Sequence, residues 1–139
     1  MAVVLLVDDD ADSSEVVARF LSKGGHCVVW QANGREALNA LSRELPDVVI
    51  LDAKMPEMDG TSFLDVIRCY LRWRSLPVIM LTGYAEGPHI RCAAEWGVKK
   101  TFLKGECDLR ELLAAVEDAA LPVSLPEHGG DLRYRQELN

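Results

Sequence analysis

The chain has 139 residues, a formal net charge of -7 and 49% hydrophobic residues, enough for one globular domain and too few for two. This charge excludes a uniformly basic nucleic-acid surface, and the apolar runs fall short of the roughly 20 residues of a membrane span. The start, Met1-Ala2-Val3, has no charged signal-peptide region, so we expect a cytoplasmic protein. The cysteines form no C-x-x-C pair, which favours buried or half-buried free thiols over a metal or redox site.

The first predicted strand is the apolar run Val3 to Val7, which ends in the acidic run Asp8 to Asp10. A run that is apolar at every position favours a strand buried on both faces of a sheet. Asp12, with Glu15 three residues later, is typical of a capping box and predicts a helix. The apolar residues of this helix share amphipathic spacing and are Val16, Val17, Phe20 and Leu21.

A second unit of a strand followed by a capped helix comes next, and then a third strand. Cys27 to Trp30 predicts a second, short strand, and Asn33 with Glu36 predicts the cap of the next helix. Val48 to Leu51 predicts a third strand that needs cover on both faces, and this strand ends in Asp52. Two predicted strands therefore end in carboxylates.

A turn at Asp59-Gly60 leads into a third predicted helix. Its apolar stripe is predicted to comprise Phe63, Leu64, Ile67 and Leu71. Pro77 to Leu81 predicts a fourth buried strand, which ends in Thr82. A weaker helix is predicted over residues 88–96, and Gly97 ends it.

Thr101 to Leu103 predicts a fifth strand that ends in Lys104, and Asp108 with Glu111 predicts the cap of a last helix. Regular alternation of strands and helices indicates a parallel sheet with helices on both faces. From Pro122 the composition changes to prolines, glycines and scattered charges, which indicates a linker or flexible tail over residues 122–139.

In a parallel sheet all strand carboxyl ends meet at one edge. The polar residues that this places together are Asp8, Asp9, Asp52, Thr82 and Lys104. Carboxylates within about 5 Å repel by roughly 3 kcal/mol per pair at an effective dielectric constant near 20, so a proton or a cation must offset them. Oxygen ligands favour Mg²⁺, and a hydroxyl and an ammonium suit phosphoryl oxygens. The set fits phosphoryl transfer to an aspartate.

This ordered set resembles the receiver domain of bacterial two-component response regulators, over Val3 to about Leu121. The resemblance rests on motifs at the strand ends, which are Leu6-Val7-Asp8-Asp9, Asp52 followed by Met55-Pro56-Glu57-Met58-Asp59-Gly60, Thr82 and Lys104. It implies a flavodoxin-like, doubly wound α/β fold with a five-stranded parallel sheet of order 2-1-3-4-5 and five helices. The receiver domain would occupy residues 1–121.

By this resemblance Asp52 is the phosphoacceptor, and Thr82 and Lys104 contact the phosphoryl group. The implied Mg²⁺ ligands are Asp8, Asp9, Asp52 and the backbone carbonyl of Lys54. The implied phosphoryl donor is a sensor histidine kinase or a histidine phosphotransfer protein. The chain would be a signalling switch rather than an enzyme, assisting at most its own phosphorylation and dephosphorylation.

The resemblance also implies an output face, made by the helix over residues 88–96, the fifth strand and the last helix. Phosphorylation would reshape this face, which would then contact a second copy or a protein target. The candidate contact residues there are charged or aromatic and comprise His89, Arg91, Glu95, Trp96, Lys99, Lys100 and Glu106.

Some residues depart from the family pattern. Asp10 matches no required position and is expected to be solvated or to cap a helix. Thr101 stands where the family usually has an aromatic residue, while Phe102 is expected in the core, and Gly105 replaces a usual proline and is expected to loosen that loop. These departures leave open a phosphorylation-independent receiver-like interaction module.

Two other classes fit less well. A hydrolase of the haloacid dehalogenase type would need its nucleophile where Glu57 stands in the stretch Glu57 to Thr61. A flavodoxin-like mononucleotide binder would need a Gly- or Ser/Thr-rich phosphate loop after the first strand, where this chain has acids.

Overall fold

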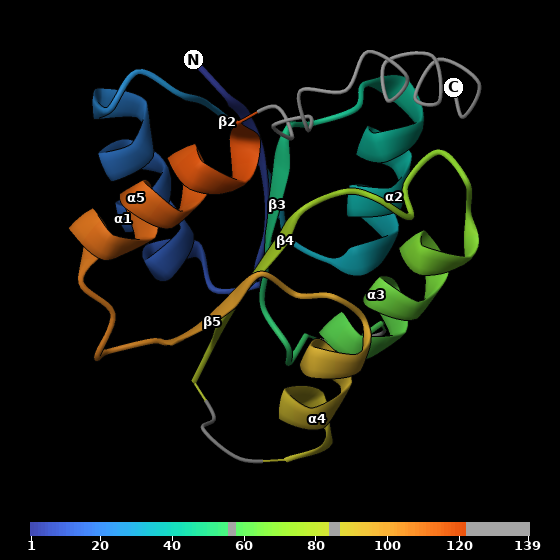
Figure 1. The fold of residues 1–139 in the computed structure, drawn as a ribbon. Helices are drawn as coiled ribbons and strands as arrows, with labels where there is room; N and C mark the ends of the chain where they lie inside the picture. The colour runs from blue at the N-terminus through green and yellow to red at the C-terminus, as the bar shows by residue number, and fades with distance from the viewer. Residues whose placement is uncertain (56–57, 84–86, 122–139) are drawn as a thin grey trace, which may run out of the picture.

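The computed structural model describes residues 1–55, 58–83 and 87–121, in which five parallel strands alternate with five helices (Figure 1). The strands are β1 (Val3–Val7), β2 (Cys27–Gln31), β3 (Val48–Leu51), β4 (Val78–Thr82) and β5 (Lys100–Leu103). The helices are α1 (Ala11–Lys23), α2 (Gly34–Arg43), α3 (Gly60–Cys69), α4 (Pro88–Glu95) and α5 (Leu109–Ala120). The strand order is β2-β1-β3-β4-β5 and every pairing is parallel, which confirms the predicted doubly wound fold.

Alternate residues of each strand face two separate cores, because successive side chains point to opposite faces of a sheet. On β3, Val48 and Ile50 face the core under α1 and α5, whereas Val49 and Leu51 face the core under α2 and α3. Figure 1 shows these helix pairs on opposite sides of the sheet. All four side chains are fully buried, and each stabilises the fold by about 1.5–3 kcal/mol. This explains why the run is apolar at every position.

Polar side chains cap the helices at the site edge of the sheet. Asn33 accepts a hydrogen bond from the backbone N–H of Glu36 at the start of α2, and Asp108 caps α5, as predicted. The predicted cap of α1 at Asp12 is wrong. Asp10 is the cap and accepts from the N–H of Asp12, which already lies inside the first helical turn and cannot cap it.

Two predictions about apolar side chains are wrong. Leu71 is 81% exposed, because α3 ends at Cys69 and the chain turns at Tyr70 before the predicted stripe is complete. Val16 is 55% exposed, whereas its neighbour Val17 is buried. Adjacent residues on a helix are about 100° apart, so both cannot face the same narrow core.

The expected burial of the thiols is also only partly correct. Cys27 lies on the edge strand β2 and Cys69 at the end of α3, and both are exposed, whereas Cys107 is half-buried. Among the described residues, no helix combines the length and apolar character needed to span a bilayer. The structure does not describe the predicted tail at residues 122–139, Pro56 and Glu57 of the motif, or the side chains of His89 and Cys92.

Candidate functional site

Three carboxylates meet where β1 and β3 end. β1 and β3 are neighbours in register, with Val7 opposite Leu51, so the residues that follow them lie side by side. Asp8, Asp9 and Asp52 each present a carboxylate oxygen within 4.8 Å of the other two. Asp8 and Asp52 are 1% and 5% exposed, while Asp9 is exposed at the rim. The structure therefore brings together the acids that the sequence placed on two separate strands.

Lys104 lies between two of these acids. Its Nζ is 2.8 Å from Oδ2 of Asp8 and 3.2 Å from Oδ2 of Asp52. The backbone N–H of Lys104 donates to the carbonyl of Thr82 at 2.7 Å, which ties the end of β5 to the end of β4. Thr82 is fully buried. The ammonium thus offsets part of the repulsion within the acidic cluster.

Lys54 adjoins Asp52 from the loop after β3. Its side chain is exposed, and its backbone N–H donates to Oδ1 of Asp52 at 3.2 Å. Both oxygens of Asp52 therefore have donors, because Oδ2 already accepts from Lys104. These contacts hold the carboxylate in one orientation at the edge of the sheet.

The electrostatics of the site raise two pKa values. Burial raises the pKa of Asp52 to about 6 from its ordinary 3.8, and the negative charge of Asp8 adds to this rise, against the opposing effect of Lys104. Burial lowers the pKa of Lys104, but its hydrogen bond to Asp8 and the charge of Asp52 outweigh this and raise it overall. At neutral pH Lys104 is therefore a cation, and Asp52 is an ionised carboxylate that takes up a proton more readily than an ordinary aspartate.

The raised pKa of Asp52 predicts a pH-dependent stability of the metal-free protein. Between about pH 6 and its unfolded value of 3.8, the folded chain holds a proton on Asp52 that the unfolded chain releases, so stability increases as the pH falls through 6. At higher pH the ionised carboxylate costs up to about 3 kcal/mol, which Asp52→Asn should remove. Urea unfolding with a chelator from about pH 8 to about pH 4 measures this difference. Parallel pH profiles for the two proteins would contradict it.

Two residues shape the site in ways that the sequence patterns did not reveal. The indole N–H of Trp30, on β2, donates to the carbonyl of Asp8 at 2.7 Å. Gly60, at the start of α3, packs on the backbone that follows β3, where an added Cβ would lie 2.4 Å from the carbonyl oxygen of Asp52. Asp59-Gly60 signalled a turn, but only the packed structure shows what the glycine touches.

Two of the residues that depart from the family pattern lie on β5 and in the loop after it. Thr101 is exposed, whereas Phe102 is buried in the core under α1 and α5, as predicted from strand alternation. Gly105 has a φ of +87°, a conformation that proline cannot adopt because its ring fixes φ near -65°. This loop therefore differs in backbone geometry from one that carries the usual proline.

The donor set fits a hard divalent cation. All three carboxylates offer oxygen atoms, which Mg²⁺ prefers, and opposite ligands of an octahedral Mg²⁺ lie about 4.2 Å apart. The observed limit of 4.8 Å is close to this spacing, and Mg²⁺ sites commonly keep several waters that tolerate small differences. The residues present can therefore hold the ion that their chemistry implies.

Comparison with known families agrees with the site. Residues 4–117 match the response regulator receiver domain family. The chain belongs to this family. Receiver domains are signalling domains, and those of response regulators are phosphorylated by kinases or phosphotransfer proteins.

Curated relatives of this receiver domain include proteins of different lengths. An uncharacterized 14.6 kDa protein in the sodA1 3' region of Leptolyngbya boryana is 35% identical over 85% of this chain and 89% of its own length. The probable transcriptional regulator ycf27 of Guillardia theta is 42% identical over 91% of this chain and 51% of its own. The transcriptional regulatory protein GlrR of Escherichia coli K12 is 36% identical over 99% of this chain and 30% of its own. The chain thus spans about half of ycf27 and under a third of GlrR.

Solved structures show the same receiver fold. The chemotaxis protein CheY4 of Vibrio cholerae superposes with a TM-score of 0.78 at 29% identity, over 86% of this chain and 98% of that one. A putative response regulator from Chloroflexus aurantiacus gives a TM-score of 0.79 at 28% identity, over 86% and 97% of the two chains. The fold and the family of this receiver domain are therefore established together.

Proposed function

We propose that this receiver domain, formed by residues 1–121, accepts a phosphoryl group on Asp52 and uses it as a reversible signal. The observation that carries the proposal is the meeting of three carboxylates and the Lys104 ammonium at one edge of the sheet. Asp52 is the candidate acceptor because it ends the buried strand β3 and donors hold both of its oxygens, Lys104 on one and the N–H of Lys54 on the other. The donor would be a histidine kinase or a histidine phosphotransfer protein.

The proposed reaction is a displacement at phosphorus, in which Asp52 replaces the histidine of the donor. A carboxylate oxygen of Asp52 attacks phosphorus, a new oxygen–phosphorus bond forms, and the phosphorus–nitrogen bond of the donor phosphohistidine breaks. The leaving imidazole nitrogen keeps the bond electrons and takes a proton from solvent. Lys104 donates hydrogen bonds to the phosphoryl oxygens as charge develops, and Thr82 supplies a hydroxyl at the same edge.

A divalent cation completes the proposed chemistry. Asp8, Asp9, Asp52 and the backbone carbonyl of Lys54 would hold Mg²⁺, which neutralises charge on the incoming phosphoryl group. Cation binding would be favourable at this site, because it would relieve the mutual repulsion of the carboxylates in the metal-free protein. Asp52 would be both a ligand of the ion and the nucleophile, whereas Asp8 and Asp9 would act as ligands alone.

Incubation of the full chain with Mg²⁺ and acetyl phosphate tests the proposal. We expect the intact mass to rise by one phosphoryl group, with the label located on the peptide that contains Asp52, because the small donor bypasses kinase recognition. A chelator should prevent the rise. A receiver domain of known acceptor activity, treated in parallel, controls for the reagent. A chain that stays unlabelled beside a labelled control would overturn the proposal and favour a phosphorylation-independent module.

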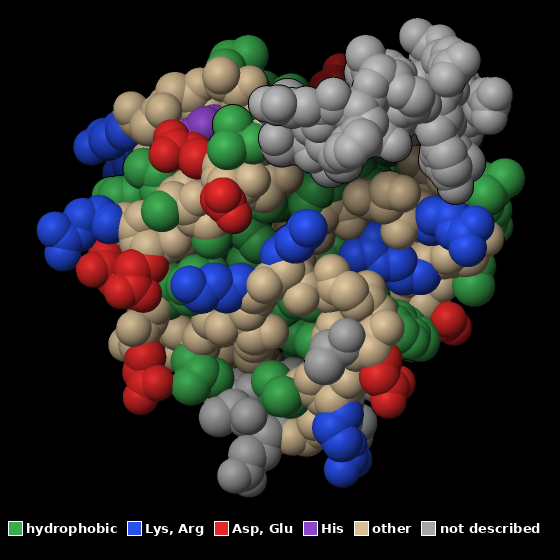
Figure 2. Space-filling view, in the orientation of Figure 1, with side chains coloured by type: hydrophobic (Ala, Val, Ile, Leu, Met, Phe, Trp, Pro, Cys, Tyr) green, Lys and Arg blue, Asp and Glu red, His purple; other side chains and the backbone are tan. Residues whose placement is uncertain are grey.

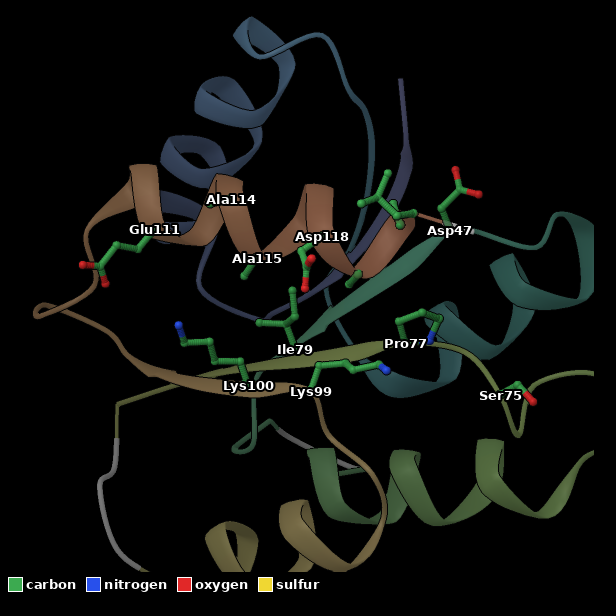
Figure 3. Close-up of a pocket in the computed structure, with 13 residues that line it drawn as sticks. Asp47, Ser75, Pro77, Ile79, Lys99, Lys100, Glu111, Ala114, Ala115 and Asp118 are labelled. Atoms are coloured by element: carbon green, nitrogen blue, oxygen red, sulfur yellow. The ribbon is translucent and has the colours of Figure 1, made fainter. Parts of the chain in front are cut away.

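We further propose that the output surface includes α5 and β5. Figure 2 shows basic side chains across the middle of one face, with acidic ones around them. A groove of about 810 Å³ lies between α5 and the strands, and Figure 3 shows Lys99 and Lys100 across it from Glu111 and Asp118. Within the described residues these opposite charges form no ion pair with one another. Such a surface suits a partner or second copy with a complementary charge pattern.

A further inference from the structure

Trp30 connects the edge strand β2 to the acidic pair after β1. It pairs in register with Leu6, and its indole Nε1 donates to the carbonyl oxygen of Asp8 at 2.7 Å. The residue is 41% exposed, so much of its surface is in solvent rather than in the core. The one hydrogen bond of its side chain among the described residues thus goes to the carbonyl of the peptide group that joins Asp8 to Asp9.

The other contacts of this turn lie on either side of that peptide. The backbone N–H of Asp8 donates to the carbonyl of Gln31 at 3.1 Å, and Oδ1 of Asp8 accepts from the N–H of Asp10 at 2.9 Å. Asp10 is held in turn as the cap of α1. Trp30 is therefore the contact, among the described residues, that fixes the direction of the Asp8 carbonyl.

The side chain of Asp9 depends on this backbone restraint. Its exposed carboxylate makes no hydrogen bond or ion pair with any residue in the described ranges, so nothing in them holds the side chain itself. The peptide before it sets where Cα and Cβ of Asp9 lie. Without the indole donor, the Asp8–Asp9 peptide could rotate, and the ordering of Asp9 would have to occur on cation binding.

We propose that Trp30 is a positioning residue that preorganises Asp9 for a divalent cation. The inference rests on the proposed cation site and assigns to β2 a part in building it. The indole contacts no reacting atom; it acts through the peptide it holds. Because a neutral hydrogen bond contributes modestly, removal of the donor should weaken Mg²⁺ binding about threefold to tenfold.

Calorimetric titration of the full chain with Mg²⁺ alone tests this, using Trp30→Phe, which keeps an aromatic ring but lacks the N–H. Trp73→Phe is the matched control, because the buried Nε1 of Trp73 has no hydrogen-bond partner among the described residues and lies in the turn after α3. We expect weaker binding for Trp30→Phe and wild-type affinity for Trp73→Phe. Acetyl phosphate labelling of Trp30→Phe should be slow at limiting Mg²⁺ and return to the wild-type rate at saturation.

The outcomes separate the two proposals. Wild-type protein that binds no Mg²⁺ would overturn the proposed function. Wild-type protein that binds Mg²⁺, with Trp30→Phe binding equally well, would overturn the positioning role alone. Thermal unfolding without metal provides the structural readout: a loss of stability in Trp30→Phe with unchanged Mg²⁺ affinity also contradicts the inference. As a second measurement, a Trp73→Phe/Trp96→Phe variant keeps Trp30 alone, and its emission should change on Mg²⁺ addition.

Discussion

The Asp52→Asn variant should gain no phosphoryl group under conditions that label the wild-type chain completely. The substitution keeps the shape of the side chain but replaces the carboxylate by an amide, which is too weak a nucleophile to form an acyl phosphate. Mg²⁺ affinity should also fall at least about tenfold, because one of three charged ligands is lost. Intact-protein mass spectrometry after acetyl phosphate treatment measures the first effect and calorimetry the second.

Asp10→Asn is the matched control for this prediction. It removes the same charge two residues from Asp8, and asparagine caps a helix about as well as aspartate, so α1 should stay folded. We expect Asp10→Asn to accept a phosphoryl group as the wild type does. Equal impairment of both variants would mean that local charge controls labelling, and a labelled Asp52→Asn would place the acceptor on another residue.

Gly60→Ala should cost about 3 kcal/mol of stability, an effect typical of a substitution that overfills a packed site. The added Cβ would lie 2.4 Å from the carbonyl oxygen of Asp52 and 2.7 Å from Cα of Ala53, both of which are backbone atoms that cannot rotate away. The helix propensity of alanine offsets at most about 1 kcal/mol of this. The backbone after β3 must shift, so phosphoryl acceptance should fall as well. Urea unfolding measures the loss.

Gly83→Ala is the corresponding control. Gly83 follows Thr82 at the same edge of the sheet, its φ is not positive, and an added Cβ would meet nothing within 4 Å. We expect its free energy of unfolding to stay within about 0.5 kcal/mol of wild type. A Gly60→Ala protein as stable as Gly83→Ala would show that the backbone after β3 shifts at little cost, which contradicts the prediction.

The strands could be predicted because burial restricts which residue types a strand can carry. A strand covered on both faces needs apolar residues at every position, and β1 and β3 show this plainly. Parallel topology then places the ends of these strands at one edge, so the proximity of Asp8 to Asp52 followed without any long-range sequence signal. The same reasoning placed Phe102 in the core and left Thr101 outside it.

The errors arose where several local patterns compete. The acidic stretch Asp8 to Asp12 offers more than one cap, and the capping-box spacing selected Asp12 although Asp10 is the residue with extended backbone. The end of α3 depends on the turn at Tyr70, which sequence spacing alone does not reveal. The bond from Trp30 depends on the register of β2 against β1, which is a property of the assembled sheet.

The ammonium of Lys104 neutralises one of the three carboxylates, so the metal-free pocket carries two excess negative charges. A bound dication would bring this balance to zero. When Asp52 becomes an acyl phosphate it loses its own charge and takes on a group with about two, so the balance changes by only about one. At physiological ionic strength counterions screen the solvent-exposed part of this change beyond about 8 Å, so little of its charge effect reaches more distant surfaces. The effect of phosphorylation would therefore be transmitted from the pocket by changes in hydrogen bonding and backbone position. The size of this effect should depend little on salt concentration.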